Sequence, residues 1–166
     1  MQHDGIAHRD IETPVGVLRL EVAVGHVVCI RFCGKTAPQA PSSARTVERE
    51  TLDRASNQLH EYFAGQRRTF DLPMVPRGTA FQLACWKALG DIAFGDVISY
   101  GEQARRIGRP RALRAVGQAN NANPLPIVVP CHRVIGASGT LTGYGGGLEV
   151  KRWLLQHEGV LPRELY

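Results

Sequence analysis

Residues 99–120 read SYGEQARRIGRPRALRAVGQAN, and this stretch decides how the second half of the chain is interpreted. Ser99 followed three residues later by Glu102 is a capping-box pattern that opens a short helix. Gly108 ends this helix, and Pro110 suits the first turn of a second one. Two short helices joined by a tight turn that contains glycine predict a helix-turn-helix, although many such pairs pack together without touching DNA.

Positive charge gathers on the second of these helices and around it. We expect the first helix to extend to Ile107 and the second to run from Arg111 to about Asn120. The formal net charge of the chain is only +5, but no Asp or Glu lies between Gln103 and Leu148. A stripe of one sign favours a polyanionic partner such as nucleic acid over the alternative of a solvated arginine-rich face. The arginines in this interval are Arg105, Arg106, Arg109, Arg111, Arg114 and Arg133.

A further capping box lies upstream and marks a domain boundary. Thr79 with Gln82 opens a helix that ends near Gly90. We place the boundary just before it, so that residues 1–76 form an N-terminal lobe and residues 77–166 a C-terminal domain. The apolar positions of this helix are Phe81, Cys85, Ala88 and Leu89.

The N-terminal lobe is predicted to be β structure followed by a helix. Pro14-Val15-Gly16 marks a turn, and a hairpin with its own turn at Gly25-His26 follows it. A helix is expected from about Ala44 to Ala64, where Gly65 ends it. The hairpin residues that alternate are Leu18, Leu20, Val22 and Val24, then Val28, Ile30 and Phe32, and the helical spacing is that of Leu52, Ala55, Leu59 and Tyr62.

Length and composition suit one compact unit or two small lobes. The chain has 166 residues, of which 43% are hydrophobic, so it can build a core without a metal or a disulfide. No apolar run approaches the roughly 20 residues that span a bilayer, and the first residues lack the layout of a signal peptide. We therefore expect a cytoplasmic protein whose four cysteines are reduced: Cys29, Cys33, Cys85 and Cys131.

The segment after the second helix leads into one of these cysteines. The apolar run Ile127-Val128-Val129 is expected to be a buried strand or extended segment, and it continues into Pro130-Cys131-His132-Arg133. A last helix is expected from about Glu149 to Glu158, with Trp153, Leu154 and Leu155 facing inward and Gly159 ending it. The glycines between these segments let backbone approach a flat ligand or simply form a flexible loop: Gly136, Gly139, Gly143 and Gly145 to Gly147.

Cys131 is the candidate nucleophile. His132 and Arg133 flank it, and such a setting is expected to lower the pKa of a thiol from about 8.5 toward neutrality. A thiolate is a strong nucleophile toward a soft alkyl carbon. Neighbouring side chains in a sequence need not touch, so the Cys-His pair alone favours an inert buried cysteine.

The wider pattern around Cys131 resembles the O6-alkylguanine-DNA alkyltransferases, also called methylated-DNA-protein-cysteine methyltransferases. The resemblance covers roughly the C-terminal 90 residues at the level of motifs, and the N-terminal lobe agrees in layout more than in sequence. The matching motifs are Arg77 to Gln82, Trp86-Lys87, Ser99-Tyr100-Gly101, Asn123 to Pro126, Pro130 to Val134, Ser138 to Gly147, Lys151 and His157-Glu158-Gly159.

The resemblance implies catalytic roles for four residues. Cys131 would accept the alkyl group, and His132, Glu158 and a bridging water would draw off its proton. Tyr100 would orient the flipped nucleotide and donate its hydroxyl to the departing guanine. Three of them have a simpler explanation when taken alone: His132 as a satisfied core histidine, Glu158 as a solvated charge at a helix end, and Tyr100 as a core aromatic. A Glu at a helix C-terminus is disfavoured by the helix dipole, which hints at a reason for its presence.

The resemblance also implies residues that bind DNA and the base. Arg114 would enter the base stack and fill the gap left by the flipped nucleotide, and Asn123 would act as a polar hinge before the cysteine segment. Backbone groups of Cys131, Val134 and Gly145 would contact the guanine edge, and Tyr144 would line the site.

These roles together imply the repair of DNA by direct reversal of damage. A methyl or other alkyl group would pass irreversibly from O6 of guanine, and from O4 of thymine, to Cys131 after base flipping, and each molecule would act once. The expected fold is α/β (α+β): a ribonuclease H-like N-terminal lobe with a small antiparallel sheet, and a mostly helical C-terminal lobe with the helix-turn-helix and Cys131. The expected partner is double-stranded DNA that contains O6-alkylguanine, bound by a monomer with cooperativity left open, without metal or cofactor.

Three other functions share parts of this pattern. A helix-turn-helix regulator with an alkylation-sensing cysteine shares the basic stripe but needs no guanine-shaped site. An alkyltransferase-like protein that only binds damage would lack Cys131. A zinc protein that uses Cys29 and Cys33 is disfavoured, because strand positions four residues apart lie roughly 13 Å from each other.

Overall fold

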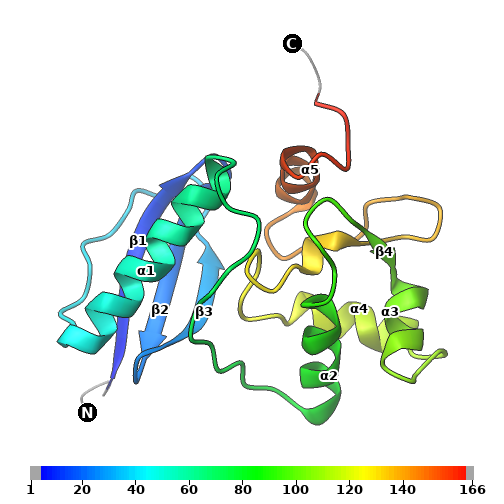
Figure 1. The fold of residues 1–166 in the computed structure, drawn as a ribbon, viewed down its shortest axis with the longest axis horizontal. Coiled ribbons are helices and arrows are strands. Elements are labelled where there is room, and N and C mark those ends of the chain that lie inside the picture. Colours follow the sequence, from blue (N-terminus) through cyan, green and yellow to red (C-terminus); the bar gives the residue numbers. More distant parts are fainter. Residues whose placement is uncertain (1–4, 164–166) are drawn as a thin grey trace. The chain divides into compact units, whose positions relative to one another are not determined.

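A computed structural model describes residues 5–163 of the chain. The chain divides into two compact units between Pro76 and Arg77 (Figure 1). A three-stranded antiparallel sheet with a helix in the first unit and several helices in the second confirm the predicted fold class.

The first unit is an antiparallel sheet with one helix packed against it. Its strands are ordered β1 (Ile6–Thr13), β2 (Gly16–Ala23) and β3 (His26–Phe32). The helix α1 (Thr46–Phe63) lies along the sheet (Figure 1). The side chains that fill the space between them are fully buried because both surfaces are apolar: Leu18, Leu20, Val22, Val27, Leu52, Ala55, Leu59 and Tyr62.

The predicted hairpin is present, but its second strand uses a different set of inward residues. A bulge between Glu21 and Val22 shifts the register of β2 against β3. As a result Val27 and Ile30 are buried, whereas Val28 is only partly buried. Val24 was expected to continue the alternation but lies in the turn, where it is 75% exposed.

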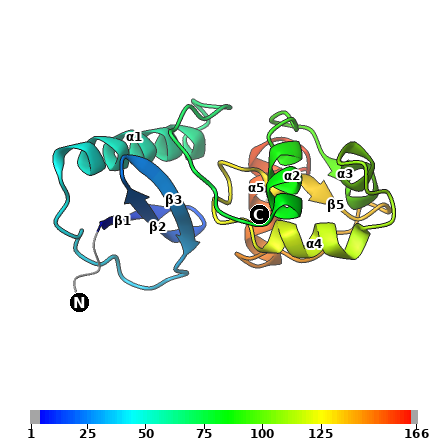
Figure 2. The ribbon, with the colours of Figure 1, turned by 90° about the horizontal axis from the view of Figure 1, so that it is seen from below.

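The second unit is mostly helical. In Figure 2 the short strand β5 lies among its helices. Its elements are α2 (Ala80–Leu89), β4 (Ile98–Ser99), α3 (Tyr100–Arg106), α4 (Leu113–Asn121), the 3-10 turn η1 (Cys131–Arg133), β5 (Val134–Ile135) and α5 (Leu148–His157).

The two helix starts predicted from capping patterns are confirmed. Thr79 and Gln82 form a complete capping box at the start of α2. At the start of α3 the Ser99 hydroxyl accepts a hydrogen bond from the backbone N–H of Glu102 at 3.1 Å. The Glu102 carboxylate pairs with Arg105 and Arg106 on the exposed side of α3.

Two local predictions in this unit are wrong. The helix α4 begins at Leu113 rather than Arg111, because Pro110 and Arg111 form a turn and Ala112 is the N-cap. Residues 127–129 form a turn instead of a strand, with Ile127 at a φ of 73° and its side chain buried. Ile127 is buried by a tight, strained backbone that periodicity cannot reveal, while Val128 and Val129 are only partly buried.

The core of the second unit contains Cys131. The cluster joins α2, α3, α4, η1 and β5, and Cys85 packs in it as the sequence indicated. Trp153 was expected to face inward but is only partly buried, and it stacks on His157. The buried members of the cluster are Cys85, Trp86, Leu89, Ile92, Ala104, Val116, Ala119, Cys131 and Val134.

Within residues 5–163, no helix is both long enough and apolar enough to cross a bilayer.

Candidate functional site

Cys131 is the first residue of the 3-10 turn η1, and its side chain is 8% exposed. Pro130 precedes it, and the backbone N–H of Cys131 donates to Val129 O at 2.9 Å. The turn is closed by a hydrogen bond from the backbone N–H of Arg133 to Pro130 O at 3.0 Å. The backbone therefore holds the sulfur in one place at the edge of the core.

The environment of Cys131 favours the protonated thiol over the thiolate. Burial raises the pKa of Cys131, while a hydrogen bond with Asn123 and the charge of Lys151 lower it in part. The expectation that His132 and Arg133 pull this pKa toward neutrality is wrong. The Arg133 guanidinium donates its hydrogen bonds to Glu158 and Ile92 O instead. Burial of the thiol outweighs the remaining positive charge.

Glu158 connects the two residues that follow Cys131. His132 Nε2 lies 2.7 Å from Glu158 Oε1, and Arg133 Nε donates to Glu158 Oε2 at 2.8 Å. Arg133 Nη2 donates to Oε1 at 3.0 Å, which completes a bidentate pair. All three side chains are buried, with 0% of His132 exposed. Glu158 is therefore a buried acceptor at the end of α5 and not a solvated helix-end charge.

The charge of Glu158 determines which ring nitrogen of His132 carries the proton. Burial alone would raise the pKa of Glu158, but hydrogen bonds from His132 and Arg133 outweigh it and lower the pKa to about 2. Burial lowers the pKa of His132, and the Glu158 hydrogen bond opposes this only in part. A neutral His132 beside an ionised carboxylate carries its proton on Nε2. Its Nδ1 is then a bare acceptor, and it has no protein hydrogen-bond partner within residues 5–163.

Tyr100 and Lys151 meet at one carbonyl group of the glycine-rich loop. The Tyr100 hydroxyl donates to Thr142 O at 3.1 Å, and Lys151 Nζ donates to the same oxygen at 3.0 Å. Lys151 Nζ also donates to Val134 O at 2.7 Å and lies 5.8 Å from the Tyr100 ring centroid. Burial lowers the pKa of Lys151 to about 8. This lysine ties the loop to β5 beside Cys131.

Asn123 fixes the turn that leads to the cysteine. Its Nδ2 donates to Val129 O at 2.8 Å, and its Oδ1 accepts from the backbone N–H of Leu125 at 3.0 Å. The same side chain hydrogen-bonds with Cys131. A residue expected to act as a polar hinge therefore lies within reach of the nucleophile as well.

The other residues predicted to bind DNA or the base lie in the second unit as well. Arg114 is exposed in the first turn of α4, and Tyr144 packs against the core cluster that contains Cys131. At Gly145 a side chain would meet no atom within 4 Å, so the backbone is open there. The carbonyl of Val134 accepts from Lys151, and its N–H donates to Cys131 O.

Sequence reasoning missed the contacts of Lys151 and Thr142. Lys151 belongs to the family motif, but it was given no role. Its position three and four residues before Leu154 and Leu155 places it on the buried face of α5, which is unusual for a lysine and was a usable signal. The backbone role of Thr142 leaves no trace in the sequence.

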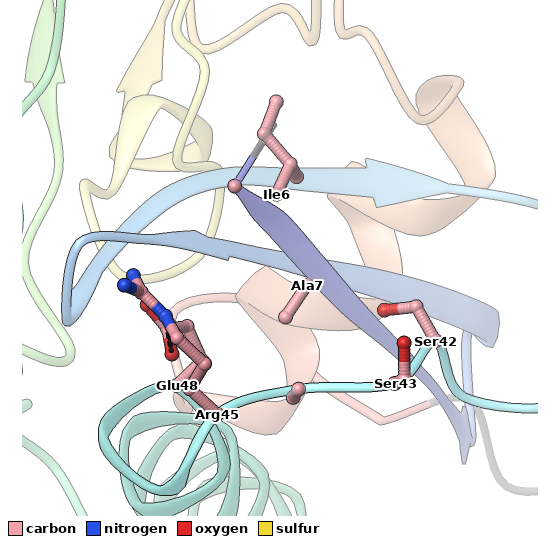
Figure 3. Close-up of a pocket in the computed structure, with 8 residues that line it drawn as sticks. Ile6, Ala7, Ser42, Ser43, Arg45 and Glu48 are labelled. Atoms are coloured by element: carbon pink, nitrogen blue, oxygen red, sulfur yellow. Dashed lines mark hydrogen bonds and ion pairs between the residues drawn. The ribbon is translucent and has the colours of Figure 1, made fainter. Parts of the chain in front are cut away.

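The described residues hold no group of three or more His, Cys, Asp or Glu side chains suited to a metal ion. A separate concavity lies in the first unit, between the start of β1 and the first turn of α1 (Figure 3). Arg45 and Glu48 form an ion pair at its margin. Its other lining residues are Gly5, Ile6, Ala7, Ser42, Ser43 and Ala44.

Comparison with known families matches both units. The DNA-binding domain of 6-O-methylguanine DNA methyltransferase matches residues 80–160, and the ribonuclease-like domain of the same family matches residues 8–76.

Curated relatives and solved structures are similar over almost the whole chain. The methylated-DNA–protein-cysteine methyltransferase of Methanosarcina acetivorans is 48% identical over 150 residues, which cover 89% of this chain and 95% of that protein. The crystal structure of the Mycobacterium tuberculosis O6-methylguanine methyltransferase has a TM-score of 0.79 at 42% identity, covering 95% and 96% of the two chains. The complex of the M. tuberculosis protein with DNA gives 0.79 at 45% identity, covering 93% and 94%.

Proposed function

Because the chain belongs to the 6-O-methylguanine DNA methyltransferase family, we propose that Cys131 is the residue that accepts the alkyl group. The protein is a methylated-DNA–protein-cysteine methyltransferase that repairs DNA by alkyl transfer. The observation that carries the assignment of the acceptor is the buried Cys131–His132–Glu158 arrangement, in which His132 Nδ1 is a bare acceptor with no protein partner. Its substrates are O6-alkylguanine and O4-alkylthymine in double-stranded DNA.

The reaction is a displacement at the alkyl carbon. The thiol proton of Cys131 passes through a water molecule to His132 Nδ1, and the sulfur attacks the carbon bonded to O6. The S–C bond forms as the C–O6 bond breaks, and the electron pair stays on guanine, which receives a proton from the Tyr100 hydroxyl. The proton held by His132 then returns through water to the Tyr100 phenolate. The products are S-alkylcysteine and guanine. No described group offers a way back to the thiol, so each molecule acts once.

The ionised Glu158 makes this proton transfer possible in a buried site. A protonated His132 would be a buried cation, which is costly without a partner. Glu158 carries the compensating charge at 2.7 Å, and Arg133 holds the carboxylate in place through two hydrogen bonds. Arg133 in turn donates to Ile92 O at 2.6 Å and lies over the Phe94 ring. The carboxylate therefore has a fixed position before the reaction begins.

Base flipping is required because the O6 alkyl group lies inside the duplex, where no sulfur can reach it in line. The helices α3 and α4 form the helix-turn-helix that enters the DNA, and exposed Arg114 fills the gap in the base stack. Asn123 links α4 to the cysteine segment, and the backbone of Val134 and Gly145 together with Tyr144 surrounds the flipped base. The protein acts as a monomer in the cytoplasm, where its thiols stay reduced.

Mass spectrometry of the intact protein tests the proposed function. After mixing with an excess of an O6-methylguanine duplex, the protein should gain the mass of one methyl group and then stop. Peptide mapping should place that methyl on Cys131. Turnover of several duplexes per protein, or a methyl on another residue, would contradict the mechanism.

Arg114→Lys separates the flipping role of Arg114 from simple phosphate binding. Lysine keeps the charge but lacks the planar guanidinium that stacks in the base column. We expect the rate constant for transfer from duplex DNA to fall about 10-fold, while the reaction with free O6-benzylguanine, which needs no flipping, stays within two-fold of wild type. Single-turnover rates on both substrates measure this split.

Arg109→Lys is the matched control, because Arg109 is an exposed arginine of the turn between α3 and α4 that is given no part in base flipping. This variant keeps the positive charge, so affinity and its salt dependence should change little, and the rate at saturating DNA should stay near that of wild type. Equal losses on both substrates for Arg114→Lys would indicate a damaged site, and no loss on duplex would remove Arg114 from the flipping step.

A further inference from the structure

Two buried amide side chains connect the helices of the helix-turn-helix. Gln103 of α3 is 0% exposed, and Asn120 of α4 is 6% exposed. Gln103 Nε2 donates to Asn120 Oδ1 at 2.9 Å, and Asn120 Nδ2 donates back to Gln103 Oε1 at 2.8 Å. Gln103 Nε2 also donates to Cys85 O of α2 at 3.2 Å. One reciprocal pair therefore joins three helices at a single point.

This point lies at one end of α4 only. The Trp86 indole N–H donates to Ala119 O at 2.8 Å, so a further buried bond to α2 holds the same turn. At the other end, the N-cap Ala112 makes no side-chain cap, and Leu113 is 48% exposed. The helix is therefore fixed by directional bonds at its C-terminal end, while the end that carries Arg114 projects away from them.

The fixed end of α4 leads directly to the reacting cysteine. Asn123 follows it and hydrogen-bonds with Val129 O and Cys131. Asn121 lies against the glycine-rich loop, since a side chain carbon at Gly143 would come within 3.6 Å of its amide group. The amide pair therefore lies where the DNA-binding helix, the cysteine segment and the loop converge.

We infer that Gln103 and Asn120 are positioning residues that set the orientation of α4, so that Arg114 enters the base stack in register with Cys131. This inference rests on the proposed function. Apolar contacts such as those of Val116 and Ala119 are not directional and tolerate small rotations of a helix. A reciprocal amide pair has one bonded geometry, and any rotation leaves buried polar groups unsatisfied.

Helix geometry shows why a small error at this point affects base flipping. Arg114 precedes Asn120 by six residues, which is about 9 Å along the helix axis. A tilt of roughly 10° at the fixed end then displaces Arg114 by about 1.5 Å. A misplacement of about 1 Å remote from the chemistry can lower a rate up to 100-fold. The chemical step at Cys131, by contrast, does not depend on where Arg114 points.

The test replaces both amides by apolar side chains of the same shape. In Gln103→Met combined with Asn120→Leu, no buried side-chain amide is left unpaired, so the variant is expected to fold. We expect its single-turnover rate on an O6-methylguanine duplex to fall about 10-fold, with its rate on free O6-benzylguanine within two-fold of wild type. The exchanged pair, Gln103→Asn with Asn120→Gln, keeps both amides and should recover at least half of the duplex rate.

Two further variants complete the test. Gln58→Met is the matched control, because it removes two hydrogen bonds of a buried glutamine to Asp71 in the first unit, and it should leave the ratio of the two rates unchanged. Trp86→Phe removes the bond to Ala119 O together with part of a buried ring, and it should lower the ratio less than the double replacement does. It keeps the test decisive should the double replacement not fold.

The outcomes are distinguishable from failure of the proposed function. If wild type gains no methyl group, the proposed function is wrong, whatever the variants do. If wild type reacts and the folded apolar pair, or Trp86→Phe in its place, reacts with duplex at the wild-type rate, the positioning role is overturned. Equal losses on duplex and free base would overturn it too, because they would show a general structural role.

Discussion

Cys131→Ser is expected to abolish alkyl transfer while leaving binding to damaged DNA within a few-fold of wild type. A serine hydroxyl remains protonated at neutral pH and is a poor nucleophile toward an alkyl carbon, so the rate should fall at least about 1,000-fold. The side chain of residue 131 is 8% exposed and lies beside Asn123, so a hydroxyl fits the space and has a hydrogen-bond partner. Intact-protein mass and a binding titration with an O6-methylguanine duplex measure the two properties.

Cys85→Ala is the matched control for this prediction. Cys85 is fully buried in the same core, and burial raises the pKa of its thiol, but neither His132 nor Glu158 bonds to it. The variant should lose about 1 kcal/mol of unfolding free energy through the small cavity it leaves, and it should still gain one methyl group. A methyl group found on the Cys131→Ser protein would show that another residue accepts it.

The elements of the fold that could be predicted are those with a local cause. The capping patterns at Thr79 and Ser99 gave the starts of two helices, because a helix start is decided by the side chains of a few neighbouring residues. The bulge between Glu21 and Val22 has no local pattern, and it changed which residues of β3 face inward. The start of α4 was misplaced because Pro110 suits a turn as well as a first helical residue.

The candidate site was predictable as a set of residues but not as an electrostatic environment. Cys131, His132, Glu158 and Asn123 were named from the sequence, and the structure brings them together. The pKa of the thiol was predicted in the wrong direction, because the charge of Arg133 was assigned to its sequence neighbour. In the folded chain the Arg133 guanidinium forms an ion pair with Glu158, twenty-five residues away. Spacing along a chain does not show which of two acceptors a cation will reach.

Glu158→Gln is expected to slow alkyl transfer strongly and to destabilise the fold. The amide oxygen can still accept from His132 Nε2, but its NH2 group then faces the Arg133 guanidinium, which stays buried without a counter-charge. Removing one partner of a buried ion pair costs about 3–5 kcal/mol. In wild type the pKa of Glu158 is about 2 against an ordinary 4.5, so its contribution to stability is fully present above pH 4.5 and is lost as the pH falls toward 2. Denaturant unfolding across this range should show that this loss is absent from the variant.

The kinetic part of this prediction separates a proton relay from a structural role. Without the carboxylate a protonated His132 has no compensating charge, so the Cys131 thiol should titrate at higher pH in Glu158→Gln than in wild type. The transfer rate should fall about 100-fold, and by the same factor on duplex DNA and on free O6-benzylguanine, because the relay acts on the chemical step and not on flipping. Arg114→Lys, by contrast, is expected to slow only the reaction with duplex DNA.

Glu149→Gln is the control, because it removes an exposed acid from the first turn of the same helix and should change neither rate. A folded Glu158→Gln protein with a wild-type rate and thiol titration would mean that Glu158 only anchors Arg133.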